Sequence, residues 1–164
     1  MSKLTVSLMG RPRILLDGAT VSLPFKQAEA LLYYLLMEGS VSRAKIADII
    51  WGDRGDEKKV KSSMRNAIYV LRKAFGHDFL QESQKSIIGI NPEYSVDVDV
   101  TRESGQPGET YTGEFLEEFY LKDNEYYNDW VMRTRQRLGQ VGQEQLKQEM
   151  ARTFDRKQDR KSVV

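Results

Sequence analysis

The chain has 164 residues, of which 40% are hydrophobic and 30% are charged, a composition typical of globular proteins. It contains no cysteine, so disulfide bonds and thiolate metal or redox sites are excluded. No apolar run reaches the roughly 18 residues that a transmembrane helix needs, and no signal-peptide pattern opens the chain. We therefore expect a cytoplasmic protein that does not enter a membrane.

The N-terminal part of the chain shows first strand and then helix patterns. Hydrophobicity alternates on both sides of the hairpin dipeptide Asp17-Gly18, which predicts a three-stranded antiparallel meander over residues 1–24. Apolar residues then recur at helical spacing over residues 26–38. Ser42 is a suitable N-cap and predicts the start of a second helix.

The third predicted helix extends from about Asp56 to Phe75 and is amphipathic. Its buried face is expected to lie within a sector of about 100°, and comprises Val60, Met64, Ala67, Ile68, Leu71 and Phe75. Its opposite face is polar and basic, and comprises Lys58, Ser62, Arg65, Asn66, Tyr69 and Lys73. The shoulders between the two faces carry Lys59, Lys61 and Arg72.

The polar face of this helix has the chemistry that the major groove of DNA requires. Lysine and arginine bind phosphates, arginine also pairs with guanine, asparagine pairs with adenine, and serine permits close approach. No acidic residue occurs between Glu57 and Asp78. Basic residues exceed acidic ones by five from Arg54 to Lys73, although the net charge of the chain is only +1. We predict a localised DNA-binding surface here, with a merely solvated helix face as the alternative.

Two further elements are candidates for DNA contacts. Apolar runs on either side of residues 82–86 predict a β-hairpin, the wing, whose tip residues Gln84 and Lys85 would reach a neighbouring groove or the backbone. Ser42 and Arg43, at the start of the second helix, are predicted to hold a phosphate. For Ser42 the alternative is a capping role alone.

The order of these elements predicts an α+β winged helix over residues 1–99, with an N-terminal antiparallel sheet, three helices and a C-terminal wing hairpin. Residues 100–110 lack periodicity and are predicted to be a linker. Residues 111–164 are predicted to be helical and amphipathic. The stretch from Glu109 to Asp129 is acidic, which raises the hypothesis that it covers the basic helix and inhibits DNA binding.

The segment from Met64 to Gly76 (MRNAIYVLRKAFG) resembles the recognition helix of the OmpR/PhoB-type winged helix in SARP-type (antibiotic regulatory protein) transcriptional regulators. The N-terminal motifs occur in the order found in that family, and Val70 stands where the family often has a basic or polar residue. Residues 111–116 (YTGEFL), followed by Trp130, resemble the start of a bacterial transcriptional activator domain, a TPR-like helical array.

This resemblance implies a DNA-binding transcriptional regulator, generally an activator, that reads the major groove with residues 56–75. It implies a promoter with direct repeats, a homodimer on DNA and contact with RNA polymerase. It also implies that residues 111–164 form only the N-terminal part of the helical array. We therefore expect the chain to be a fragment of a longer regulator.

Other functions find less support in the sequence. His77 is the only histidine and follows a helix end, and no phosphate-binding loop, HExxH motif or nucleophile elbow occurs. Glu114, Glu117 and Glu118 have no histidine or cysteine nearby, so we expect no catalytic residue, metal site or cofactor. The main alternative is a protein-interaction module in a signalling assembly, whose winged helix and helical segment both bind protein partners.

Overall fold

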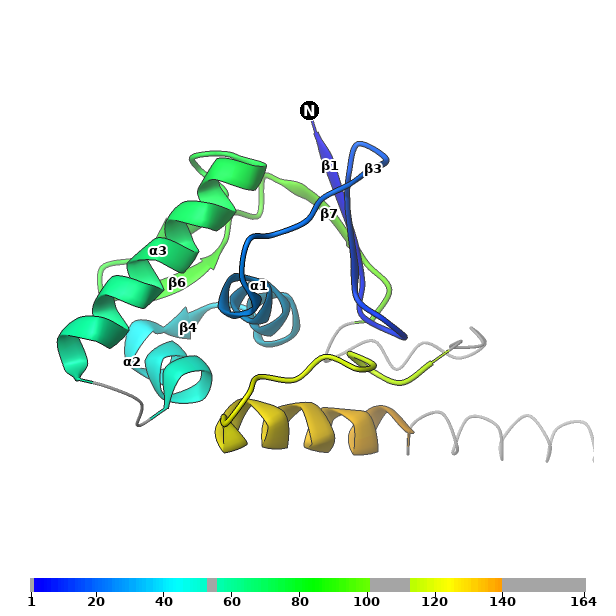
Figure 1. The fold of residues 1–164 in the computed structure, drawn as a ribbon. Coiled ribbons are helices and arrows are strands. Elements are labelled where there is room, and N and C mark those ends of the chain that lie inside the picture. The colour runs from blue at the N-terminus through cyan, green and yellow to red at the C-terminus, as the bar shows by residue number, and fades with distance from the viewer. Residues whose placement is uncertain (1, 53–55, 101–112, 140–164) are drawn as a thin grey trace, which may run out of the picture.

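In a computed structural model of the chain, residues 2–52, 56–100 and 113–139 are described. A four-stranded sheet of order β3-β2-β1-β7 comprises β1 (Lys3–Ser7), β2 (Arg13–Leu16), β3 (Ala19–Thr20) and β7 (Ser95–Val98). A three-stranded sheet of order β4-β6-β5 comprises β4 (Val41–Ser42), β5 (Leu80–Glu82) and β6 (Ile87–Ile90). The labelled helices are α1 (Lys26–Glu38), α2 (Arg43–Ile46), the π-helix η1 (Ala47–Trp51) and α3 (Glu57–Phe75), and a further helix covers residues 125–139. In Figure 1, α1 lies near the centre, between α3 and the sheet that contains β1.

The predicted N-terminal meander is confirmed. Strands β1 and β2 pair antiparallel with Leu4 opposite Leu16, and β2 pairs antiparallel with β3. Asp17 and Gly18 both adopt positive φ in the turn, as the hairpin dipeptide predicts. The sheet also contains β7, which pairs in parallel with β1. This pairing was not predicted, because it joins two segments that are about ninety residues apart in the chain.

The helices and the wing also agree with the winged-helix prediction. Helix α1 has the predicted bounds, and Asp56 is the N-cap of α3, where its side chain accepts a hydrogen bond from the backbone N–H of Lys59 at 2.8 Å. The second helix differs in its second half, since Ala47–Trp51 forms a π-helix. Strands β5 and β6 form the predicted antiparallel wing.

Residues 113–139 share one hydrophobic core with the N-terminal part of the chain. A β-bridge joins Phe115 to Met9, and Tyr127 and Trp130 are buried against α1. The prediction of helix from residue 111 is wrong for residues 113–124, which form turns and the bridge; the helix there covers residues 125–139. The physical reason is that the side chains of this segment pack into the core from a backbone that forms turns. Three of its residues, Leu116, Glu118 and Asp123, have positive φ.

Residues 101–110 of the predicted linker and half of the predicted TPR-like array lie outside the described residues, so the domain division stays a prediction. Val100, at the start of that linker, is fully buried. The adjacent Asp99 carboxylate accepts hydrogen bonds from the backbone N–H groups of Leu8 and Met9. Within the described ranges, no helix is both long enough and apolar enough to cross a membrane.

Candidate nucleic-acid interface

Helix α3 has one buried face, which fixes the side that faces solvent. Five of the six residues predicted for the core are buried, namely Met64, Ala67, Ile68, Leu71 and Phe75. Val60, the sixth, is half-buried and packs against the same core. The apolar spacing of the sequence therefore fixes the rotation of the helix about its own axis.

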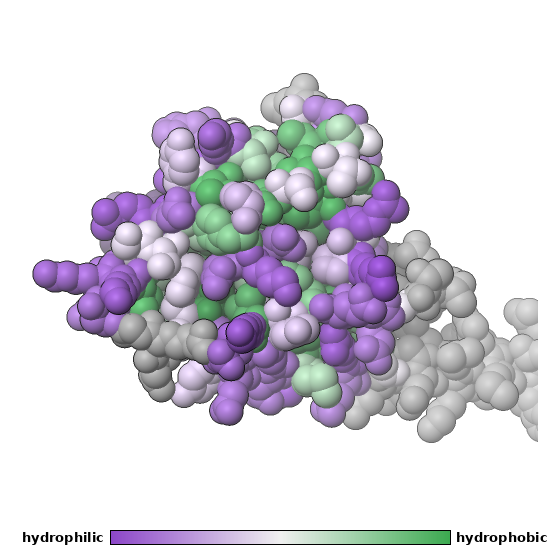
Figure 2. All heavy atoms as spheres, in the orientation of Figure 1, coloured by the Kyte–Doolittle hydropathy of each residue, from purple (hydrophilic) through white to green (hydrophobic). Residues whose placement is uncertain are grey.

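The opposite face of α3 is exposed. Every residue predicted to face the groove is solvent-accessible, namely Lys58, Ser62, Arg65, Asn66, Tyr69 and Lys73. Tyr69 has 60% of its surface exposed, which is high for so large an aromatic side chain. Hydrophilic side chains line the outer side of the molecule along α3 in Figure 2, whereas apolar surface appears between α3 and the strands β1 to β3. The exposed face thus presents hydrogen-bond donors and positive charge to solvent.

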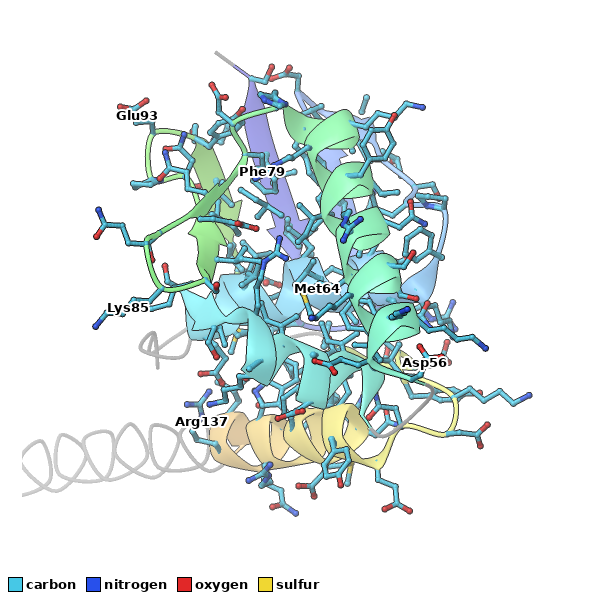
Figure 3. The ribbon with its side chains drawn as sticks, turned by 90° about the vertical axis from the view of Figure 1, so that its left-hand side faces the viewer. Asp56, Met64, Phe79, Lys85, Glu93 and Arg137 are labelled. Carbon is cyan, nitrogen blue, oxygen red and sulfur yellow. The ribbon has the colours of Figure 1, made fainter. Side chains whose placement is uncertain are left out.

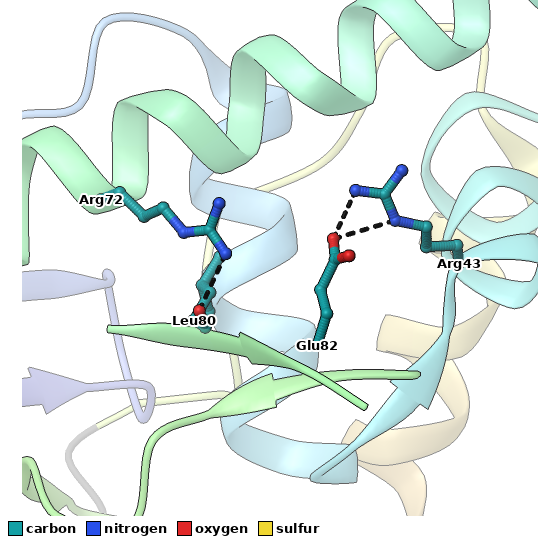
Figure 4. A network of polar contacts seen from close by, with 4 residues as sticks. All are labelled: Arg43, Arg72, Leu80 and Glu82. Atoms are coloured by element: carbon teal, nitrogen blue, oxygen red, sulfur yellow. Dashed lines mark hydrogen bonds and ion pairs between the residues drawn. The ribbon is translucent and has the colours of Figure 1, made fainter. Parts of the chain in front are cut away.

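The three shoulder residues of α3 behave differently from one another. Lys59 and Lys61 are exposed, and Lys61 Nζ lies 3.6 Å from the carboxylate of Glu57, one helical turn away. Arg72 instead turns toward the wing, where its Nη2 donates a hydrogen bond of 2.9 Å to the carbonyl oxygen of Leu80 (Figure 4). Its Nε is buried and has no hydrogen-bond partner among the described residues. In this structure Arg72 therefore joins α3 to β5.

The wing lies beside α3 on the same face of the molecule, and Lys85 extends away from the body at its tip (Figure 3). Gln84 and Lys85 are both exposed, as predicted for tip residues. Ser86 follows with a positive φ of 56°, a conformation that ends the turn. Helix and wing together form a continuous surface, with the wing tip available to a ligand that lies along α3.

Ser42 and Arg43 have local partners. The Ser42 hydroxyl accepts a hydrogen bond from the backbone N–H of Lys45 at 3.2 Å, so it caps α2. Arg43 forms an ion pair with Glu82 of β5, and its Nε donates to a carboxylate oxygen at 3.0 Å. The Arg43 backbone N–H donates to the carbonyl oxygen of Ser86 at 2.8 Å. The role of Glu82 was not predicted from the sequence, where its only signal was an acidic residue in a wing strand near a basic helix start.

A groove of about 770 Å³ separates α2 and η1 from the first half of α3. Its apolar lining includes Ala44, Ala47, Val60 and Met64. Its charged lining comprises Arg43, Asp48, Glu57, Lys61 and Arg65. Three of these five charges are positive, so the groove continues the basic surface of α3 toward the wing.

In the acidic segment, Glu114, Glu118 and Asp129 have ion-pair partners within the described residues. Glu118 pairs with Arg11, and Asp129 pairs with Arg133 on its own helix. Glu114 lies 4.0 Å from Arg135, whose guanidinium also donates to two backbone carbonyl groups. None of these three partners lies on α3. Across the described residues, no group of three or more acidic or histidine side chains has the geometry to hold a metal ion.

No family model matches the chain, and no curated protein does. Among solved structures, a match is found to Mycobacterium tuberculosis EmbR in complex with a low affinity phosphopeptide. The two chains are 16% identical and superpose with a TM-score of 0.48, over 58% of this chain and 27% of that chain. This chain therefore spans about a quarter of the length of the other. At this level of similarity the match does not assign the chain to a family or a function.

Proposed function

We propose that this protein is a sequence-specific DNA-binding transcriptional regulator. The observation that carries the proposal is the exposed face of α3, which combines Lys58, Arg65, Asn66 and Lys73 with a wing alongside. A helix of this kind fits the major groove, where arginine and asparagine read base edges and lysine binds phosphates. The exposed Lys85 on the wing supplies a further cation for the DNA backbone.

The finer features of the proposal come from the resemblance of residues 64–76 to SARP-type recognition helices. On that basis the protein acts as an activator, binds direct repeats in a promoter as a homodimer, and contacts RNA polymerase, and the composition of the chain favours the cytoplasm as its location. It performs no catalysis and needs no cofactor for binding DNA. Arg43 and Arg72 have protein partners in this structure, so the groove-facing residues of α3 are proposed to be the principal contacts.

The test begins with a selection of bound sites from random-sequence duplex DNA, which yields the operator and its half-site spacing. Binding of the selected duplex is then measured by fluorescence anisotropy for the wild type and for Arg65→Ala with Lys73→Ala. We expect the double variant to bind about 10- to 1,000-fold more weakly, since an arginine–base contact contributes about 1–3 kcal/mol and the loss of a lysine–phosphate contact adds to this. Arg13→Ala with Lys122→Ala, two exposed cations outside α3, is the matched control and should bind like the wild type.

An unchanged affinity in the Arg65→Ala, Lys73→Ala variant would show that α3 is not the reading element. If the wild type binds no DNA even at low salt, where nonspecific electrostatic binding is strongest, the proposal fails altogether. The protein-interaction module then becomes the better explanation, with α3 and the wing as surfaces for an acidic protein partner.

A further inference from the structure

We infer that Glu82 is an electrostatic gate on a phosphate-binding arginine, and that a DNA backbone phosphate replaces its carboxylate on Arg43 when DNA binds. This inference rests on the proposed function and deepens it, because it assigns a regulatory role to an acidic residue inside the basic surface. The residues concerned meet where α2, α3 and the wing come together (Figure 4).

Glu82 lies between two arginine side chains and is accessible to solvent. Glu82 lies two residues after Leu80 on β5, and its side chain points toward α3, between the guanidinium groups of Arg72 and Arg43 (Figure 4). Arg43 contacts it through both Nε and Nη2. The side chains of Arg43 and Glu82 remain 40% and 36% exposed. The pair is therefore accessible to a ligand that lies between the helix and the wing.

Further cations line the groove that Arg43 borders. Arg43 and Ser86 line the groove beside α3 together with Lys61 and Arg65, and these three cations outnumber the two acids of the lining, Asp48 and Glu57. A backbone phosphate that bridges α3 and the wing would meet this cluster. It would also meet the Glu82 carboxylate, and repulsion between like charges would weaken binding as long as that carboxylate stays in place.

The chemistry of arginine makes the exchange possible. A guanidinium group binds carboxylate and phosphate with the same fork of N–H donors, so a phosphate oxygen can take the position of the Glu82 oxygen. Exposed ion pairs contribute little to stability, so the pair opens at little cost. The Arg43 side chain would then leave Glu82 and bind a phosphate of the DNA backbone, without any change in the fold.

The Arg43–Glu82 pair is not needed to hold the wing in place. Strand β4 pairs with β6, with Val41 opposite Ile88, and the Arg43 backbone N–H binds the Ser86 carbonyl oxygen. Arg72 separately joins α3 to the backbone of β5. Because backbone contacts already fix the wing, the side chains of Arg43 and Glu82 are free to exchange partners.

The test compares DNA binding by the wild type, Glu82→Gln, Arg43→Gln and the double variant, across a series of salt concentrations. Glu82→Gln should bind several-fold more tightly, because no carboxylate competes for Arg43, with a slope of log K against log salt close to that of the wild type, because Arg43 neutralises the same phosphate in both proteins. Arg43→Gln should bind more weakly and give a shallower slope. In the Arg43→Gln background, Glu82→Gln should tighten binding by less than it does in the wild type, because Arg43 is no longer there to be released.

Glu118→Gln is the matched control, because Glu118 forms an exposed ion pair with Arg11, which lies on another part of the chain. It should leave both affinity and slope unchanged. Weaker binding by Glu82→Gln with unchanged thermal unfolding, or an equal gain from Glu82→Gln in the wild-type and Arg43→Gln backgrounds, would overturn the gate while leaving the proposed function intact. An Arg43→Gln variant that binds like the wild type would overturn it independently. If the wild type binds no DNA, the proposed function fails and the gate fails with it.

Discussion

Two surfaces of the molecule differ in kind. One is the exposed face of α3, and the other is the buried interface between α1 and residues 113–139. The α3 face presents Arg65, Asn66 and Tyr69 to solvent. The other surface is closed and aromatic, with the Tyr34 and Trp130 rings 4.9 Å apart and the Tyr127 hydroxyl bound to the carbonyl oxygen of Ala30. Burial raises the pKa of the Tyr127 hydroxyl, which keeps it protonated as a donor.

This difference in burial distinguishes residues that stabilise the fold from residues that are available to a partner. The same residue type has opposite consequences on the two surfaces, because burial decides whether its loss leaves a cavity and unpaired groups or only a change in solvation. Pairs of identical residues, one on each surface, therefore provide the sharpest tests of this comparison.

The largest effect is expected for tyrosine. Tyr127→Ala removes a fully buried ring and its hydrogen bond to α1, and should lower the free energy of unfolding by about 3–5 kcal/mol. Tyr69→Ala, at a residue with 60% exposure on α3, should change it by less than about 0.5 kcal/mol but should weaken DNA binding. Urea denaturation and anisotropy measure the two quantities. Equal stability losses in the two variants would show that the α3 face is not a free surface.

A smaller effect is expected for asparagine. The buried Asn124 amide donates to the carbonyl oxygens of Ile49 at 3.0 Å and Ile50 at 2.6 Å, near the end of η1. Asn124→Ala leaves these acceptors unpaired and should destabilise the protein by about 1–3 kcal/mol. Asn66→Ala on α3 should leave the urea midpoint unchanged and relax base preference in the site selection. A stable Asn124→Ala variant would indicate that the end of η1 does not depend on residues 113–139.

The same comparison explains which features the sequence predicted. The bounds of α3, its Asp56 cap and its buried face depend on residues within the helix, where spacing is directly readable. The roles of Arg43 and Arg72 depend on β5, and the Arg43–Glu82 pair spans 39 positions of the chain. The turning backbone of residues 113–124 depends on contact with Met9. Such features need the tertiary arrangement, which local periodicity does not contain.

The smallest predicted effect concerns Glu29, which lies on α1 and accepts a hydrogen bond from the Tyr33 hydroxyl at 3.3 Å. Burial raises the pKa of Glu29 above its ordinary value, although the Tyr33 hydrogen bond and the charge of Lys26 oppose the shift. The folded state therefore binds a proton more tightly than the unfolded state. By linkage, this carboxyl group destabilises the fold as pH rises from the unfolded pKa, near 4.5, through the higher folded pKa.

Glu29→Gln keeps the acceptor for Tyr33 and removes the half-buried charge, so the variant should be slightly more stable than the wild type at pH 7. The advantage should shrink as pH falls toward 4.5, the ordinary pKa of glutamate, because the wild-type carboxyl group then becomes neutral as well. Thermal unfolding at a series of pH values measures both trends. Glu93→Gln, at an exposed carboxylate before β7, controls for the loss of one negative charge. If Glu29→Gln lowers the stability at pH 7, the attraction between Glu29 and Lys26 outweighs the burial of the carboxylate.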